Sequence, residues 1–306
     1  MLFIPNFSSG YNLKNYLENC APLLIVVCGL TFITFNGGID FSITSVISMG
    51  SAIGAYVMVY SPFQSELAST ILGVGTMLLI GFVTGYVNGL SVSRLKMPSF
   101  VATLATMLIG SGIAVWFASV LFEKTSISGL PAMFLLLGGS DESFWIPILI
   151  AAIVFLFSDW LMTKNIFGRQ VFAVGVNPKA AAVSGISVKK TVLLLSVISG
   201  IYAGIACIIY TARNGAGIPT LGSNMFINIV GSVIIGGTSP TGGSGSMRKS
   251  LYGVLFLVLI DKILNLLGTP YVYYDIIKGL LILLAAMFEM TIRRINAKAA
   301  AQAARQ

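Results

Sequence analysis

Apolar residues occur in long runs along almost the whole chain, and short polar gaps separate these runs. A helix that crosses the hydrocarbon core of a bilayer needs roughly 20 mainly apolar residues. The runs predict nine crossings, at residues 20–35, 41–60, 67–92, 99–122, 144–162, 191–211, 224–235, 250–267 and 272–290. The first and the seventh are short, and both run directly into paired glycines. The pattern therefore predicts an all-α, polytopic transmembrane helix bundle that contains short, glycine-broken helices.

Composition agrees with a chain whose main solvent is lipid. Of its 306 residues, 56% are hydrophobic and 9% are charged, and the mean hydropathy is +0.93. The crossings use nearly all of the chain, so we expect a single transmembrane domain over residues 1–306. The first apolar run ends without a small-residue cleavage site, which favours a retained helix over a signal peptide. We expect a multi-pass protein of a bacterial plasma membrane.

Basic residues gather in the gaps on one predicted side of the membrane. Short cytoplasmic loops are rich in Lys and Arg, and residues 164–190 hold five basic residues and no acidic one. If the crossings alternate, this side also holds Arg94, Lys96, Arg248, Lys249, Arg293, Arg294, Lys298 and Arg305. The opposite side then holds Glu66, Asp141 and Glu142, the N-terminus, and Arg213 as an exception. The side of residues 164–190 is therefore predicted to be cytoplasmic.

The net charge of +8 changes this picture little. Its Lys and Arg residues lie in short gaps rather than on one face of a domain, which argues against nucleic-acid binding. Histidine is absent, and the three cysteines lie inside apolar runs without CxxC spacing. No metal site, disulfide or Cys-His nucleophile is therefore expected, and the cysteines are interpreted as small buried residues.

The first candidate site joins two apolar runs through Asn36, Gly37, Gly38, Asp40 and Ser42. Irregular backbone at membrane depth is tolerated only where protein buries it or where it lines a watery cavity. A carboxylate there is costly enough to indicate a role in a translocation path or a gate. Asp just before a helix is also a good cap, and the two interpretations are compatible.

The second candidate site is the glycine-rich stretch 236–246, whose selected residues are Gly236, Gly237, Thr238, Gly242 and Gly243. A Walker A loop needs Lys and then Ser or Thr after its second glycine, and Gly243 follows Gly242 here. The stretch is therefore not an ATP-binding loop of that kind. It is either a flexible cytoplasmic turn or a hinge between helices that move during transport.

The third candidate site is the cytoplasmic loop 163–190. Asn177 is a suitable N-cap, Pro178 fits the first helical position, and Gly185 can end the helix. We expect a helix of one or two turns that stands in the cytosol, where it could contact a partner protein. The selected residues are Asn177, Pro178, Lys179, Ala180, Ala181, Ala182, Gly185 and Ile186.

An internal repeat is also suggested by two stretches with the same order of features. Gly37 and Arg94 are 57 positions apart, and Gly236 and Arg293 are 57 positions apart. Each interval holds two crossings and ends in basic residues. A parallel repeat and a coincidence of helix spacing explain this equally well.

Taken together, these segments resemble the ribose-type permease subunits of ATP-binding-cassette sugar importers. Residues 37–42 read Gly-Gly-Ile-Asp-Phe-Ser, similar to that family's Gly-Gly-Ile-Asp-Leu-Ser. Residues 175–186 are similar to its loop Gly-Gly-Asn-Pro-Glu-Ala-Ala-Arg-Leu-Ser-Gly-Ile, although Lys179 stands where Glu is common. Residues 233–239 and 264–268 match two further motifs, so the resemblance covers the chain in order.

The resemblance implies a transport subunit that is not itself an enzyme and binds no cofactor. Its implied partners are an ATPase on the cytosolic side, which uses ATP and Mg, an extracytoplasmic solute-binding protein, and a second permease subunit, identical or different. On this resemblance, 163–190 is the coupling loop to the ATPase. Members of the family also carry one more spanning helix at the start. Residues 2–7 resemble the end of that helix, so ten crossings are expected if it is present.

Three other functions are weighed against a sugar permease. A related permease could carry nucleosides or branched-chain amino acids. A self-powered secondary transporter predicts ionisable residues in the middle of its helices, and the crossings hold few: Asp159, Asp261, Lys262, Asp275, Lys278 and Glu289. An intramembrane enzyme is disfavoured because the chain has no histidine and no evident carboxylate pair.

Overall fold

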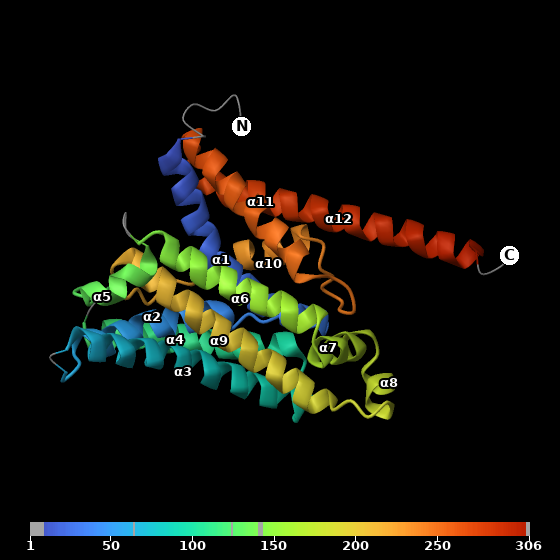
Figure 1. The fold of residues 1–306 in the computed structure, drawn as a ribbon, viewed down its shortest axis with the longest axis horizontal. Helices are drawn as coiled ribbons and strands as arrows, with labels where there is room; N and C mark the ends of the chain where they lie inside the picture. Colours follow the sequence, from blue (N-terminus) through green and yellow to red (C-terminus); the bar gives the residue numbers. More distant parts are fainter. Residues whose placement is uncertain (1–8, 64, 124, 140–142, 304–306) are drawn as a thin grey trace.

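The computed structural model describes residues 9–63, 65–123, 125–139 and 143–303, which form helices and loops with an isolated β-bridge between Ile127 and Gly217. The helices are α1 Gly10–Phe35, α2 Ile43–Val59, α3 Glu66–Ser93, α4 Ser99–Val115, α5 Ala132–Leu135, α6 Trp145–Thr163, α7 Ile166–Val176, α8 Pro178–Val183, α9 Val188–Asn214, α10 Phe226–Ile235, α11 Met247–Leu266 and α12 Val272–Ala303. A π-helical turn, Trp116–Leu121, extends α4. Figure 1 shows α3, α4, α6 and α9 running in roughly the same direction, with α7 and α8 at one end. The predicted all-α bundle is confirmed.

Each predicted crossing lies on a helix. Five helices are long and apolar enough to span a bilayer, namely α1, α3, α4 with its π-turn, α6 and α9. Helix α1 begins ten residues before the predicted crossing, because Ser9 caps it and a polar first half precedes the apolar run. At 26 residues it is therefore not a short helix, unlike α10.

Helix α1 forms the centre of the bundle. In its apolar window 89% of the residues are buried, against 22% for α6. It packs against α6, α9, α10 and α11. A helix segment that is apolar all round is typically buried, so the apolar part of α1 is the central helix against which the others pack.

Helices α3 and α9 approach each other through small residues. A Cβ atom added at Gly81 would meet the carbonyl oxygen of Gly200, and one at Gly85 would meet that of Ser196. Gly81, Gly85 and Gly89 recur every four residues and form one face of α3. Small residues at this spacing let membrane helices pack by close backbone contact, which explains why these two helices make the largest helix pair.

Helix α10 is too short to cross the membrane by itself. Ten residues span about 15 Å, half of a hydrocarbon core of about 30 Å. An irregular segment, residues 215–225, precedes it along α2. The hydroxyls of Ser51 and Ser48 accept hydrogen bonds from the backbone N–H groups of Ile218 and Gly222, both at 3.0 Å. Irregular backbone is therefore satisfied by protein at membrane depth.

The charged residues separate between the two ends of the bundle as predicted. The end that holds α7 and α8 also holds the loop at 36–40, which contacts the loop at 236–246 and Ser99, the first residue of α4 after the loop at 94–98. Arg213, the exception at the other end, lies 3.5 Å from Glu18 and is paired with it. The predicted Asp141 and Glu142, and residues 2–7 and Arg305, lie outside the described residues.

Candidate functional site

The first two candidate sites, and the start of the third, meet at one junction. Gly243 donates its backbone N–H to the carbonyl oxygen of Phe35 at 3.0 Å, at the end of α1. A Cβ on Gly242 would lie 2.7 Å from the backbone nitrogen of Gly37. A Cβ on Gly175, in α7, would meet the carbonyl oxygen of Phe35. Glycine is required here because three backbone segments touch with no room for a side chain.

The same helix ending occurs on both sides of this junction. Gly37 donates to Thr34 O and Gly38 to Ile33 O at the end of α1. At the end of α10, Gly237 donates to Ile234 O, and the following residue closes the same pattern. Gly37 and Gly237 have φ of +72° and +77°, as the Schellman motif requires. The equivalent positions are thus 200 residues apart, one more than the sequence spacing indicates, and the two ends share one local structure.

Asp40 lies near the glycine junction and links the start of α2 to α9. It is 3% exposed, and its Oδ1 accepts from the backbone N–H of Ser42 at 3.0 Å and from the Ser42 hydroxyl at 2.6 Å. Its Oδ2 accepts from the hydroxyl of Ser199, on α9, at 2.8 Å. Both carboxylate oxygens are thus satisfied, and the carboxylate caps the start of α2 as the sequence predicts. Its role in a path or gate remains a proposal.

Two polar residues inside predicted crossings extend this network, and sequence reasoning did not select them. Asn88 of α3 donates to the Ser42 hydroxyl at 2.8 Å and accepts from the hydroxyl of Thr106, on α4, at 2.9 Å. Asn88 is almost fully buried. The signal available in the sequence was the position of Asn88 inside an apolar run, since polar groups at membrane depth need partners.

Thr238, in the glycine-rich loop, lies in a second polar cluster. Its Oγ1 is 3.3 Å from the hydroxyl of Ser250, which also accepts from Thr31 of α1 at 2.8 Å. All three side chains are fully buried. Gly236 packs against the carbonyl oxygen of Lys249 at the start of α11. The loop is therefore anchored to α1 and α11 and is not a free turn.

A small cavity lies beside the glycine junction. It has a volume of about 120 Å³, and Asn36, Gly37, Gly38 and Asp40 line it together with residues of α3, α4 and α9. The selected residues of the first site, apart from Ser42, therefore share one hollow.

The third candidate site forms the predicted short helix. The side chain of Asn177 accepts from the backbone N–H groups of Lys179 and Ala180, Pro178 is the first residue of α8, and Gly185 ends it at φ +84°. Only Ala181 of the helix is buried, while Val183 is 91% exposed. Residues 163–190 also contain α7, a helix that the sequence analysis did not predict. An exposed apolar side chain on a capped helix is suited to a protein contact.

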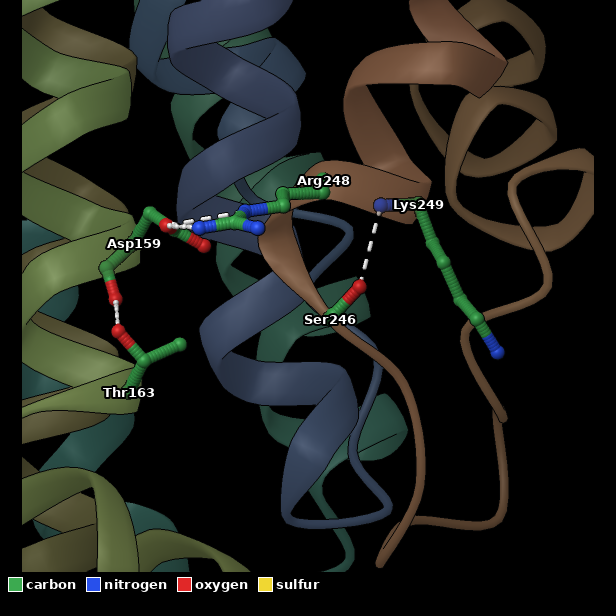
Figure 2. A network of polar contacts seen from close by, with 5 residues as sticks. All are labelled: Asp159, Thr163, Ser246, Arg248 and Lys249. Atoms are coloured by element: carbon green, nitrogen blue, oxygen red, sulfur yellow. Dashed lines mark hydrogen bonds and ion pairs between the residues drawn. The ribbon is translucent and has the colours of Figure 1, made fainter.

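An ion pair ties the start of α11 to the end of α6. Arg248 donates from Nε and from one terminal nitrogen to Asp159 Oδ2, at 3.2 and 3.1 Å. Figure 2 shows this pair with Thr163, which donates to the Asp159 carbonyl, and with Ser246, which caps the backbone N–H of Lys249. The glycine-rich loop, through α11, is thereby joined to the helix that leads into α7 and α8.

Within the described ranges, no group of three His, Cys, Asp or Glu side chains could hold a metal ion. Cys20, Cys28 and Cys207 are free and buried. Their interpretation as small buried residues is confirmed.

Comparison with known proteins gives one consistent result. Residues 12–286 match the family described as branched-chain amino acid transport system / permease component. The ribose import permeases of Haemophilus influenzae and Bacillus subtilis are each 32% identical to the chain, over 92% and 93% of it and 86% of their own length. The L-arabinose transport system permease of Escherichia coli is 29% identical over 94% of the chain and 85% of its own length.

Proposed function

The chain belongs to the family of branched-chain amino acid transport system permease components, and from this premise we propose that it is the permease subunit of an ATP-binding-cassette importer for a monosaccharide. Ribose and arabinose are the sugars named for its relatives. The observation that carries the proposal is the likeness to ribose permeases over more than nine-tenths of the chain. Nucleosides and branched-chain amino acids are the alternative solutes.

We propose three partners for this subunit. They are an ATPase on the cytosolic side, a solute-binding protein on the outer side, and a second permease subunit, identical or different. ATP and Mg are used by the ATPase, and transport is driven from there. Family membership supports this arrangement over a self-powered transporter.

The coupling contact is proposed for α8 and its flanks, residues 177–186. This segment stands at the basic end of the bundle, its cap holds it as a helix, and its Val183 side chain is exposed. It reaches the glycine junction through α7, whose Gly175 touches the end of α1. A shift of α8 caused by the ATPase would therefore be passed to the junction of Phe35, Gly37 and Gly242.

The glycine junction is proposed as the hinge, and Asp40 as part of the translocation path. Left-handed backbone at Gly37, Gly237 and Gly242 has no side chain to resist a change of dihedral angle. The cavity beside Asp40 supports a path that narrows at this depth.

The test is to tag the chain in its native membrane, purify it gently and identify the proteins that accompany it by mass spectrometry. We expect an ATP-binding-cassette ATPase and a solute-binding protein. Vesicles that hold the recovered complex should take up labelled D-ribose or L-arabinose only when ATP is supplied. Uptake of a nucleoside or a branched-chain amino acid instead would change the solute. Recovery of the chain alone, with ion-driven uptake, would overturn the proposal.

A further inference from the structure

A large cavity lies far from the glycine junction, at the opposite end of the bundle. Its volume is about 760 Å³, within the range of small-molecule sites. The first half of α1, the starts of α10 and α12, and the end of α11 line it. The loop between α11 and α12 also contributes, and the charge pattern places that loop on the outer side of the membrane. The cavity is therefore at the end where a solute enters.

An ion pair forms part of the cavity wall. Lys278 of α12 lies 2.6 Å from Asp261 of α11, and their side chains are 5% and 30% exposed. Charges at membrane depth are costly and usually serve a function. These two charges neutralise each other, and the remaining charge among the described lining residues is the ammonium group of Lys262. The wall therefore offers a zwitterionic solute no unpaired carboxylate.

Two lysines fix the orientation of two asparagine amides in the same wall. Lys278 Nζ donates to Asn228 Oδ1 at 2.9 Å, and Lys262 Nζ donates to Asn15 Oδ1 at 3.2 Å. An ammonium group can only donate, so each amide must present its oxygen to the lysine. The NH₂ groups of Asn228 and Asn15 are then left as donors, and neither has an acceptor among the described residues.

The rest of the wall supplies acceptors and aromatic surface. Part of the Asp261 carboxylate remains exposed, and Tyr210 of α9 also lines the cavity. The ring of Tyr274 lies 5.8 Å from Lys278 Nζ. The amide NH₂ groups can donate to a solute, and the Asp261 carboxylate and the tyrosine hydroxyls can accept from it. This set of groups matches a solute whose hydroxyls both donate and accept.

We infer that this cavity is an outer binding site for a neutral, polyhydroxylated solute of monosaccharide size, held by the amide NH₂ groups of Asn15 and Asn228 and by Asp261. The inference rests on the proposed function and adds to it the residues that receive the sugar. The site opens on the outer side, so it is the first contact of the solute with the permease.

The sharpest variants are Asn228→Asp and Asn15→Asp. Each keeps an oxygen for its lysine and replaces only the NH₂ donor by an acceptor. Asn224→Asp is the matched control, because Asn224 is exposed, lies four residues before Asn228 and does not line the cavity. Asn228→Leu removes the whole amide, both the NH₂ donor and the oxygen that accepts from Lys278, without adding a charge, so it separates the loss of the amide from the added charge.

The experiment measures ATP-driven uptake of labelled D-ribose and L-arabinose by vesicles that hold the whole complex. We expect uptake to fall at least tenfold in Asn228→Asp, Asn15→Asp and Asn228→Leu and to stay within twofold in Asn224→Asp. Recovery of the ATPase with each variant shows that the variant has folded and assembled. If the wild type takes up sugar and the assembled cavity variants take it up equally fast, this inference alone is overturned. A wild-type complex that takes up no monosaccharide would overturn the proposed function and the inference with it.

Discussion

Asp40 shows how one buried side chain can organise several helices. Its carboxylate receives the N–H and hydroxyl of Ser42 and the hydroxyl of Ser199, and Asn88 continues the chain of hydrogen bonds to α4. A buried network in which each member is satisfied fixes one arrangement of its helices.

Replacing this carboxylate should therefore destabilise the fold. Asp40→Ala removes a helix cap worth about 1 kcal/mol and leaves a buried hydroxyl unpaired at a cost of about 1–3 kcal/mol. We expect the melting temperature in detergent to fall by roughly 5 to 10 °C. Fluorescence-detected size-exclusion after heating measures it, with Glu66→Ala, an exposed acidic residue, as the control. Equal melting of Asp40→Ala and wild type would show that the network adds no stability.

Sequence reasoning identified Asp40 but not its partners, for a physical reason. The Asp before an apolar run has a recognisable local role as a cap. Ser199 lies 159 positions away, and its contact depends on how α9 packs against α2. The same holds for Asn15 and Asn228, whose cavity forms only when α1, α10, α11 and α12 come together.

Among the elements, the α3–α9 pair has the most extensive contact and a clear internal control. At Gly85 an added Cβ would meet the backbone of α9, whereas at Gly75, on the same helix, it would meet open space. Backbone cannot move aside as a flexible side chain can.

We expect Gly85→Ala to lose at least about 1–3 kcal/mol through overpacking, and Gly75→Ala to be neutral or slightly stabilising, since Ala is the better helix former. The yield of monodisperse protein from membranes and its melting temperature measure the difference. Equal loss in both variants would mean that a glycine is needed for a reason other than close packing.

Helix α8 is an element whose function can be separated from its fold. Val183→Glu places a charge on a side chain that is 91% exposed, so the permease should fold as before. We expect at least a tenfold loss of ATPase recovered on purification. Val272→Glu, at the opposite end and also largely exposed, is the control. Full recovery of the ATPase with Val183→Glu would remove this side chain from the coupling contact.

At the scale of elements, the apolar runs predicted the positions of the membrane helices well. They did not predict where a helix begins in polar residues or that a helix forms inside a loop. Helix α1 begins in the polar residues before its run because Ser9 caps it. Helix α7 was missed because its 11 residues belong to a basic loop. The Asn177 cap and the Gly185 ending were predictable since both depend on neighbouring residues only.

In the whole molecule, the Arg248–Asp159 pair links the two halves of the proposed coupling route. Arg248 precedes the body of α11 and follows the glycine-rich loop, while Asp159 precedes the loop that carries α8. Partly exposed ion pairs add little stability, so the pair matters for transmission more than for folding.

We expect Arg248→Ala to melt a few degrees below wild type, because the Asp159 side chain, 13% exposed, loses its cation. The larger effect should be a ratio of sugar transported to ATP used that is at least threefold lower. The charge exchange, Arg248→Asp with Asp159→Arg, should recover part of that ratio. Simultaneous assays of uptake and phosphate release on the same vesicles measure it. An unchanged ratio in Arg248→Ala would exclude the pair from the coupling route.

The short α10 also affects how the protein is made. Ten residues are too few for the translocon to release as an independent membrane segment. The nascent chain from α9 to α11 must therefore be held until its parts meet, with residues 215–225 shielded by the already inserted α2. Biogenesis of the second half thus depends on the first, and the order of synthesis becomes part of the folding mechanism.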